Sequence, residues 1–179
     1  MLGAPLPSPL SPMLSTCFPP LARRDARILI LGSLPGQMSL RLNQYYGQPR
    51  NAFWRIMAAT FSFPPDLPYS DRVAALQSHH IAAWDVCASA FRPGSLDSNL
   101  SDIVINDFHV FFKTHKAIRL ICFNGQTSEK LYRRNALPTL PRPFAEIPTR
   151  QLPSTSPAHA GMTFARKLAQ WGPALTDQE

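Results

Sequence analysis

Four β-like apolar runs alternate with amphipathic segments along this chain, and this alternation restricts its fold more than any other feature. The runs are RILILGS (27–33), IAAWDVC (81–87), AIRLICFNG (117–125) and EIPTRQLPS (146–154). Ala-Ala-Trp in the second run and Pro148 in the fourth reduce the β propensity of those two. Near-continuous apolar strands separated by helices are typical of a parallel sheet with both faces covered. The sequence therefore predicts an α/β fold around a mostly parallel sheet of four strands.

The segments between these runs carry apolar residues at helical spacing. One helix is expected around Phe53, Met57 and Phe61, and a second around Val73 and Leu76, with His80 one turn on. Further helices are expected on the apolar face made by Val104, Phe108, Phe111 and Phe112, and over 129–135 and 161–171.

Residues 1 to about 20 hold six prolines and no charged side chain, a composition that favours an extended flexible tail outside the fold. The remainder, 21–179, shows no internal repeat and no boundary, so a single domain is expected. The formal charge is +7, and 14 of the 18 basic residues are arginine, which favours a polyanionic partner such as nucleic acid. Charge alone also fits a moderately basic protein with no such partner.

Cys17, Cys87 and Cys122 lie far apart in the sequence and form no CxxC pair. Neither a disulfide framework nor a metal or iron–sulfur cluster is therefore expected. No apolar run approaches the roughly 18 residues that a membrane span needs. The proline-broken start of the chain lacks the basic residues of a secretory signal. We expect a cytoplasmic protein, with a monomer as the default.

Polar and glycine-rich segments follow the predicted strands and should meet at one edge of the sheet, because the carboxyl ends of parallel strands lie together. These segments are 32–36, 85–89, 124–125 and 154–159. In the first of them, GSLPG, the glycines let the backbone approach a flat ligand closely, and Pro35 fixes the turn. An ordinary strand-to-loop turn would have the same composition.

The stretch QYYGQPRN (44–51) follows in a loop punctuated by glycine and proline. Tyr45 and Tyr46 offer adjacent aromatic faces that can stack on a base rotated out of its duplex. Arg50 and Asn51 add a positive charge and an amide. Phe53 and Trp54 come next, and covering the core is the favoured alternative for these two.

Five segments resemble, in this order, the motifs of the uracil-DNA glycosylase superfamily, and within it the hypoxanthine-DNA glycosylase (deoxyinosine glycosylase) branch. They are GSLPGQMSL, QYYGQPRNAFW, WDVCASAFRPGSLDSN, ICFNG and LPSTSPAHA. The resemblance covers the chain after about Phe18, so 21–179 is expected to be one glycosylase-like domain. It implies a three-layer α-β-α sandwich around a four-stranded parallel sheet, and cleavage of the glycosidic bond without metal or cofactor.

The resemblance places the first catalytic motif at 32–36 and the second at 154–160. Mismatch-specific relatives hold the attacking water with an asparagine in the first motif, where this chain has Leu34, which cannot do so. The hypoxanthine branch also lacks a polar group there, and Asn51 is the best match for its catalytic amide. An amide can hold a water but is no strong base, so positioning and stabilisation of the departing base must supply the rate. The alternative is that Asn51 caps the helix that begins near Phe53.

The remaining expected site residues follow from these motifs. The base is expected to contact Gly32, Ser33, Leu34, Pro35, Gly36, Tyr45, Tyr46, Phe53 and Asn124. DNA is expected to contact Arg50, Arg92, Ser154, Thr155, Ser156 and His159, with Arg92 and the STSPAHA loop as candidates for opening the duplex. A satisfied turn amide is the alternative for Asn124, and a capping loop is the alternative for the segment that holds His159. Asp85 and Asp97 are further polar groups at plausible site positions, without an assigned role.

The sequence thus favours a monofunctional glycosylase that flips a deaminated base, with hypoxanthine as the expected base, out of DNA and hydrolyses its glycosidic bond. A lyase step is not expected because all four lysines fall on predicted helices or just beyond one. The same reaction on uracil or another deaminated base is one alternative. A second is an inactive DNA-binding module, which Leu34 would allow. A small-molecule nucleotide or ester hydrolase ranks last, because no P-loop, nucleophile elbow or metal cluster is present.

Overall fold

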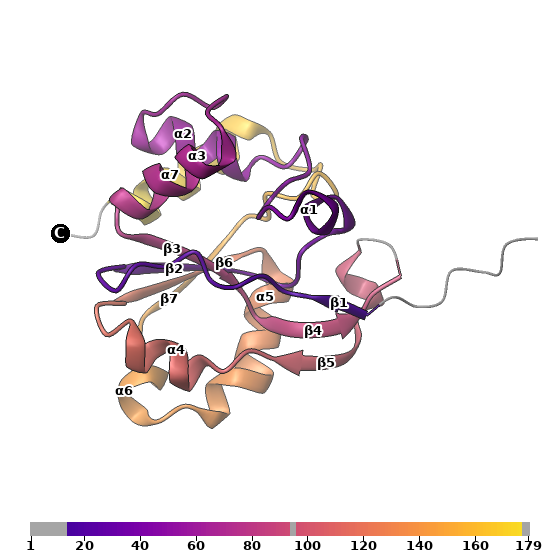
Figure 1. Ribbon diagram of the computed structural model, residues 1–179, viewed down its shortest axis with the longest axis vertical. Helices are drawn as coiled ribbons and strands as arrows, with labels where there is room; N and C mark the ends of the chain where they lie inside the picture. The colour runs from indigo at the N-terminus through magenta and orange to yellow at the C-terminus, as the bar shows by residue number, and fades with distance from the viewer. Residues whose placement is uncertain (1–13, 94–95, 177–179) are drawn as a thin grey trace, which may run out of the picture.

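A four-stranded parallel sheet forms the centre of the computed structural model, which describes residues 14–93 and 96–176 (Figure 1). Its strands lie in the order β3, β2, β6, β7. They span Ile28–Gly32 (β2), Ile81–Asp85 (β3), Leu120–Asn124 (β6) and Thr149–Leu152 (β7). All three pairings are parallel, so the predicted sheet is confirmed.

Helices cover both faces of this sheet and give the three layers (Figure 1). One face carries α2 (Phe53–Phe61), α3 (Tyr69–Ser78) and α7 (Phe164–Thr176), and the other carries α4 (Phe108–Thr114), α5 (Gln126–Leu131) and α6 (Arg142–Ala145). Within β2, Ile28 and Ile30 pack toward the first set, and Leu29 and Leu31 toward the second. Alternate side chains of a strand point to opposite faces, so a sheet covered on both sides requires an unbroken apolar run.

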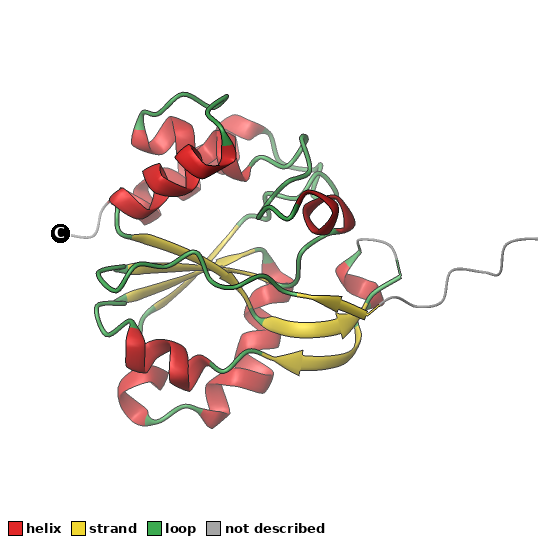
Figure 2. Cartoon of the chain, viewed as in Figure 1, coloured by secondary structure: helices red, strands yellow, loops and turns green. Residues whose placement is uncertain are grey.

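A second sheet, absent from the sequence prediction, lies beside the first (Figure 2). It is antiparallel, in the order β1 (Leu14–Thr16), β4 (Cys87–Phe91), β5 (Ser101–Ile105). The run predicted as one strand over 81–87 is therefore divided, because β3 ends at Asp85 and β4 begins at Cys87 in the other sheet.

Three predicted helices differ in their limits. Val104 was expected on a helical face with Phe108 but lies in β5, because the helix starts only after Asp107, whose carboxylate accepts a hydrogen bond from the Val110 amide. The expected helix over 129–135 begins earlier, as α5, and passes into a π-helical turn at Tyr132–Ala136. A short helix, α1 (Gln37–Leu42), follows GSLPG directly, where a loop was expected. The last helix runs to Thr176, beyond its expected end.

No helix in the described part of the chain is long and apolar enough to cross a membrane.

The expected tail boundary near residue 20 is wrong for the residues from Leu14 onward. Leu14–Thr16 pairs with β4, and the Phe18 ring meets the Tyr45 ring edge-on, with 5.2 Å between centroids. The Phe18 carbonyl accepts hydrogen bonds from the Tyr45 hydroxyl (3.0 Å) and the Trp84 indole (3.2 Å). Proline content averaged over twenty residues hides these few anchoring side chains. The rest of the expected tail, 1–13, lies outside the described residues.

Phe18→Ala is expected to lower the free energy of unfolding by about 2 kcal/mol, because a half-buried aromatic ring loses its packing against Tyr45. Urea denaturation measures this difference. Leu14→Ala is the control, since Leu14 is 53% exposed, and should change stability by no more than about 0.5 kcal/mol. Equal losses in the two variants would show that Phe18 is not an anchor of the fold.

Candidate active site

A pocket of about 620 Å³ opens where the parallel strands end. The sequence predicted that 32–36, 85–89, 124–125 and 154–159 meet there, and all four contribute to the wall, the second through Asp85 and the third through Asn124. The segment between β2 and α2 completes it, with Tyr45, Tyr46, Gln48, Arg50 and Asn51. Of the predicted site residues, only Phe53 does not line this pocket.

The GSLPG loop is held from behind by Arg92. The Arg92 guanidinium donates hydrogen bonds to the carbonyls of Leu34 (3.3 Å) and Pro35, and to the Asp97 carboxylate (3.1 Å). Asp97 in turn accepts a hydrogen bond from the Ser33 hydroxyl at 2.8 Å. Arg92 was expected to contact DNA or open the duplex, but it is only 4% exposed and bound to the loop backbone. In this arrangement it fixes the loop and is not available to phosphate.

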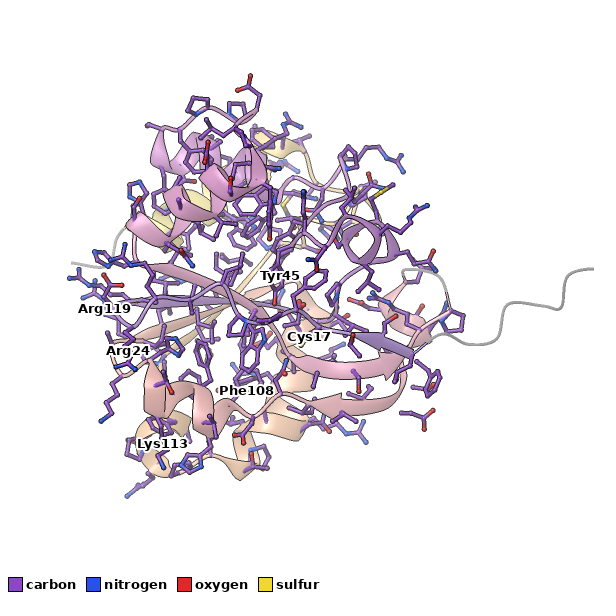
Figure 3. All side chains as sticks on the ribbon, viewed as in Figure 1. Cys17, Arg24, Tyr45, Phe108, Lys113 and Arg119 are labelled. Atoms are coloured by element: carbon purple, nitrogen blue, oxygen red, sulfur yellow. The ribbon has the colours of Figure 1, made fainter. Side chains whose placement is uncertain are left out.

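The two tyrosines have different surroundings. Tyr45 is 3% exposed and lies in the interior near Cys17 (Figure 3), so its ring cannot stack on a base as expected. Tyr46 stacks on Phe53, with ring centroids 3.8 Å apart and planes 17° apart. Phe53 is fully buried, so it supports Tyr46 from the core instead of contacting a ligand itself. Tyr46 has a φ of 55°, a left-handed conformation that is rare for a bulky residue.

Asn51 lies in the pocket wall, just before Ala52, the N-cap residue of α2. Its side-chain oxygen accepts a hydrogen bond from the Phe53 amide, the first of α2, at 2.9 Å, so Asn51 binds the helix start as the capping alternative expected, although Ala52 holds the N-cap position. Its amide nitrogen has no hydrogen-bond partner among the described residues. The next residue, Ala52, donates its backbone amide to the Thr155 carbonyl at 3.0 Å, which joins this segment to the second motif. The cap therefore fixes the direction of the Asn51 amide at the pocket.

Asn124 ties the end of β6 to the second motif. Its side-chain oxygen accepts from the Thr155 amide and its side-chain nitrogen donates to the Thr155 hydroxyl, both at 2.8 Å. Thr155 is buried, and the loop is anchored again where the Trp171 indole donates to the Pro153 carbonyl at 2.9 Å. The side chain of Asn124 also interacts with the Tyr46 hydroxyl, which links the second motif to the segment before α2. Contact between Asn124 and a base stays a prediction.

Asp85, which the sequence analysis left without a role, carries a buried carboxyl group at the pocket. It is 4% exposed, and its Oδ2 atom has no hydrogen-bond partner among the described residues. Burial raises the pKa of Asp85 from 3.8 to about 7, with Arg92 opposing this rise and Asp97 adding to it. The sequence signal for this residue was its position: Asp85 is the polar residue that ends the apolar run of β3.

Gly32 makes room for this carboxyl group. A Cβ atom added at Gly32 would lie 2.5 Å from Asp85 Oδ1 and 3.4 Å from the Tyr46 hydroxyl oxygen. A side chain at this position would therefore displace Asp85. The Tyr46 hydroxyl is also buried beside Gly32, where its nearest polar neighbour is the Asn124 side chain, so two buried polar groups converge at this glycine.

The family model described as the uracil DNA glycosylase superfamily matches residues 19–172 of this chain. The chain belongs to this superfamily. A protein named hypoxanthine DNA glycosylase from Methanosarcina acetivorans is 41% identical over 115 residues, which are 64% of this chain and 73% of that protein. A protein of the same name from Methanosarcina barkeri is 38% identical over 112 residues, 62% of this chain and 71% of that protein. These similarities confirm the predicted hypoxanthine-DNA glycosylase branch.

A solved structure supports the fold of this glycosylase. The solution NMR structure of a Methanosarcina acetivorans protein, provisionally described as a uracil DNA glycosylase, superimposes with a TM-score of 0.77. It is 34% identical and covers 92% of this chain and 98% of its own. The likeness covers nearly all of both chains, so the three-layer fold predicted from the motifs is confirmed.

Charged and polar groups lie unevenly around the glycosylase pocket. Arg50 and His159 are exposed, whereas Asp85, Arg92 and Thr155 are buried. Among residues 14–93 and 96–176, no three His, Cys, Asp or Glu side chains come together as a possible metal site.

Asp85→Asn is expected to remove a pH dependence of stability. A folded-state pKa near 7, above the ordinary 3.8, means that folding is favoured by the proton. This stabilisation is complete below about pH 4 and is lost as the pH rises through about 7. The melting temperature of the wild type should therefore fall relative to Asp85→Asn between these limits. Asp66→Asn, at an exposed loop position, is the control and should follow the wild type. Parallel melting curves for Asp85→Asn and wild type at every pH would contradict the raised pKa.

Proposed function

We propose that this chain is a monofunctional DNA glycosylase that removes hypoxanthine from DNA by hydrolysing its N-glycosidic bond. The observation that carries the proposal is a single pocket that gathers both superfamily motifs, the fixed Asn51 amide and the supported Tyr46 ring. Hypoxanthine is favoured because both curated relatives bear the name hypoxanthine DNA glycosylase. Uracil is the second candidate, because the similar solved structure is described as a uracil DNA glycosylase.

In this reaction Asn51 positions the attacking water. Departure of the base leaves positive character on the sugar, and a neutral amide can hold a water beneath C1′ without adding a full charge. The oxygen of Asn51 is shared with the Phe53 amide, so the free side-chain nitrogen and the remaining lone pair address the water. Water forms the new bond to C1′, and the electron pair of the broken bond leaves with the base.

The base is held by the loop and by Tyr46. One face of the Tyr46 ring rests on Phe53, and stacking of the flipped base on Tyr46 fits its place in the pocket wall. Backbone groups of 32–36 provide polar contacts to the edge of the base. Asn124 keeps the 154–156 loop in place and interacts with the Tyr46 hydroxyl, so it also supports the Tyr46 side chain.

DNA contacts come from the rim of the pocket. Arg50 and His159 are exposed there, and the 154–156 loop offers hydroxyl and amide groups to phosphate. Leu96 is 55% exposed and also lines the pocket, so this apolar side chain is suited to enter the space that a flipped base leaves. It takes the place of Arg92 as the candidate for opening the duplex.

Asn51→Ser is expected to lower the excision rate on the order of 10²-fold with little loss of stability, because serine can keep the capping bond but cannot hold the water in place. The assay incubates end-labelled duplexes holding one deoxyinosine or one deoxyuridine, cleaves abasic sites with hot alkali, and follows single turnovers. Asn135→Ala, exposed and outside the pocket, is the control. Cleavage of neither substrate by the wild type would refute the proposed function, and an undiminished rate in Asn51→Ser would remove Asn51 from the mechanism.

Tyr46→Leu is expected to weaken binding of a flipped base by about 1–3 kcal/mol, because the stacking platform is lost. Tyr46→Phe should retain most of the affinity, since it keeps the ring stacked on Phe53. Binding is measured with a duplex that holds an uncleavable deoxyinosine analogue, against the same duplex with ordinary bases. Equal losses in both variants would assign the effect to the hydroxyl group instead of the ring.

A further inference from the structure

We infer that Asp85 is a further catalytic residue of this site, whose protonated carboxyl group donates a hydrogen bond to N7 of the flipped purine and transfers its proton as the base leaves. The inference rests on the proposed function, because it concerns the leaving group of that reaction. It assigns chemistry to a residue that neither motif of the superfamily contains.

The position of the carboxyl group is the first argument. Asp85 ends β3 and pairs in register with Gly32, the first residue of the GSLPG motif. Its main-chain carbonyl accepts a hydrogen bond from the Asn106 side chain at 2.8 Å, and so the backbone is held while the carboxyl group faces Gly32. Because Gly32 has no side chain, the carboxyl group lies directly against its backbone, and both residues line the pocket. The carboxyl group is therefore placed beside the first motif, in the wall of the pocket that would hold the base.

The unsatisfied hydrogen-bonding capacity is the second argument. Asp85 Oδ2 is buried and has no partner within the described structure. A buried polar group without a partner costs about 1–3 kcal/mol, and in the wall of a pocket a bound ligand or a reaction can supply the missing partner. The purine edge of hypoxanthine presents two acceptors, O6 and N7. A protonated carboxyl group can donate to one of these, whereas a carboxylate would repel both.

The surrounding charges favour the protonated form near neutral pH. The titratable and charged groups that act on Asp85 or respond to its charge are Arg92, Asp97, Tyr45, Tyr46, Cys17 and Cys87. Arg92 is the positive one, but its hydrogen bonds go to Leu34, Pro35 and Asp97. Burial outweighs its attraction and brings the pKa of Asp85 to about 7. An acid with a pKa near the working pH is the most effective proton donor.

Proton transfer from Asp85 makes the purine a better leaving group. As the C1′–N9 bond breaks, its electron pair enters the purine ring, and transfer of the Asp85 proton to N7 lets the base leave as neutral hypoxanthine. The water held by Asn51 forms the bond to C1′ and releases one proton, which restores the Asp85 carboxyl group directly or through solvent. The net reaction is hydrolysis of the glycosidic bond, and water is the only reactant besides the DNA. Uracil has no counterpart of N7, so this contribution favours the purine.

The test is the pH dependence of single-turnover excision of deoxyinosine, measured from about pH 6 to pH 8.5. The wild-type rate is expected to fall by about tenfold per pH unit above pH 7, as the acid ionises. Asp85→Asn keeps a donor of the same shape but has no proton to transfer. It should be about 10²-fold slower at pH 6, with a flat profile. Asp66→Asn should reproduce the wild-type rate and profile, because Asp66 is exposed and does not line the pocket.

A second substrate identifies the accepting atom. In 7-deazadeoxyinosine a carbon replaces N7, so the wild type is expected to excise this base about as slowly as Asp85→Asn excises hypoxanthine, and Asp85→Asn should cause no further loss. Full wild-type activity on the 7-deaza substrate would overturn the assignment to N7. A wild-type profile that is flat, or that persists unchanged in Asp85→Asn, would overturn the role of Asp85 and leave the proposed function intact. A wild type that excises neither hypoxanthine nor uracil at any pH would refute the proposed function and this inference with it.

Discussion

The rest of the structure depends on the burial of one strand, β2 (Ile28–Gly32), which is paired on both edges and covered on both faces. Every side chain of that strand lies in a core, and the two cores belong to different helical layers. A strand held in this way cannot shift its register without exposing apolar surface on one side. Its carboxyl end is therefore a fixed point from which the GSLPG loop departs.

The loops at this edge are held by polar side chains that bind backbone groups. Arg92 binds the carbonyls of 34–35 from one side, and Asn124 binds the backbone amide of Thr155 from the other. Both groups are buried or half-buried, where a lost hydrogen bond is costly, so they keep the two motifs at a constant separation. A site that depends on positioning more than on a strong base requires such rigidity.

The sequence predicted the elements that follow a repeating apolar pattern, and it missed those that depend on contacts between distant parts of the chain. Unbroken apolar runs identified β2 and β6, and the parallel order brought the predicted site segments to one pocket. The antiparallel sheet was missed because its strands are short and only partly apolar, and Val104 imitates the helical spacing of α4.

The misassigned side chains have the same explanation. Arginine in a basic protein suggests phosphate, and adjacent tyrosines suggest stacking. Whether Arg92 or Tyr45 turns inward is decided by partners far away in the chain, the carbonyls of 34–35 and of Phe18. Asp85 was recognised as polar at a strand end, but its burial could not be read from its neighbours in sequence.

The leucine in the first motif has a physical reason in this packing. Leu34 is buried and clusters with Cys87 and Ala90 of the antiparallel sheet, so its side chain serves the core while its carbonyl is bound by Arg92. An asparagine at position 34 would place a polar amide in that apolar cluster, and burying an amide without hydrogen-bond partners is unfavourable. In the proposed reaction the water-holding amide comes instead from Asn51, which lines the pocket just before α2. The apolar cluster behind GSLPG also helps to keep water away from Asp85, because Cys87 of that cluster lies two residues after Asp85 in the chain. With Leu34 in the core and the proposed water-holding amide at Asn51, the pocket wall beside Gly32 is left to Asp85, an acid whose burial favours the protonated form that we infer for purine departure.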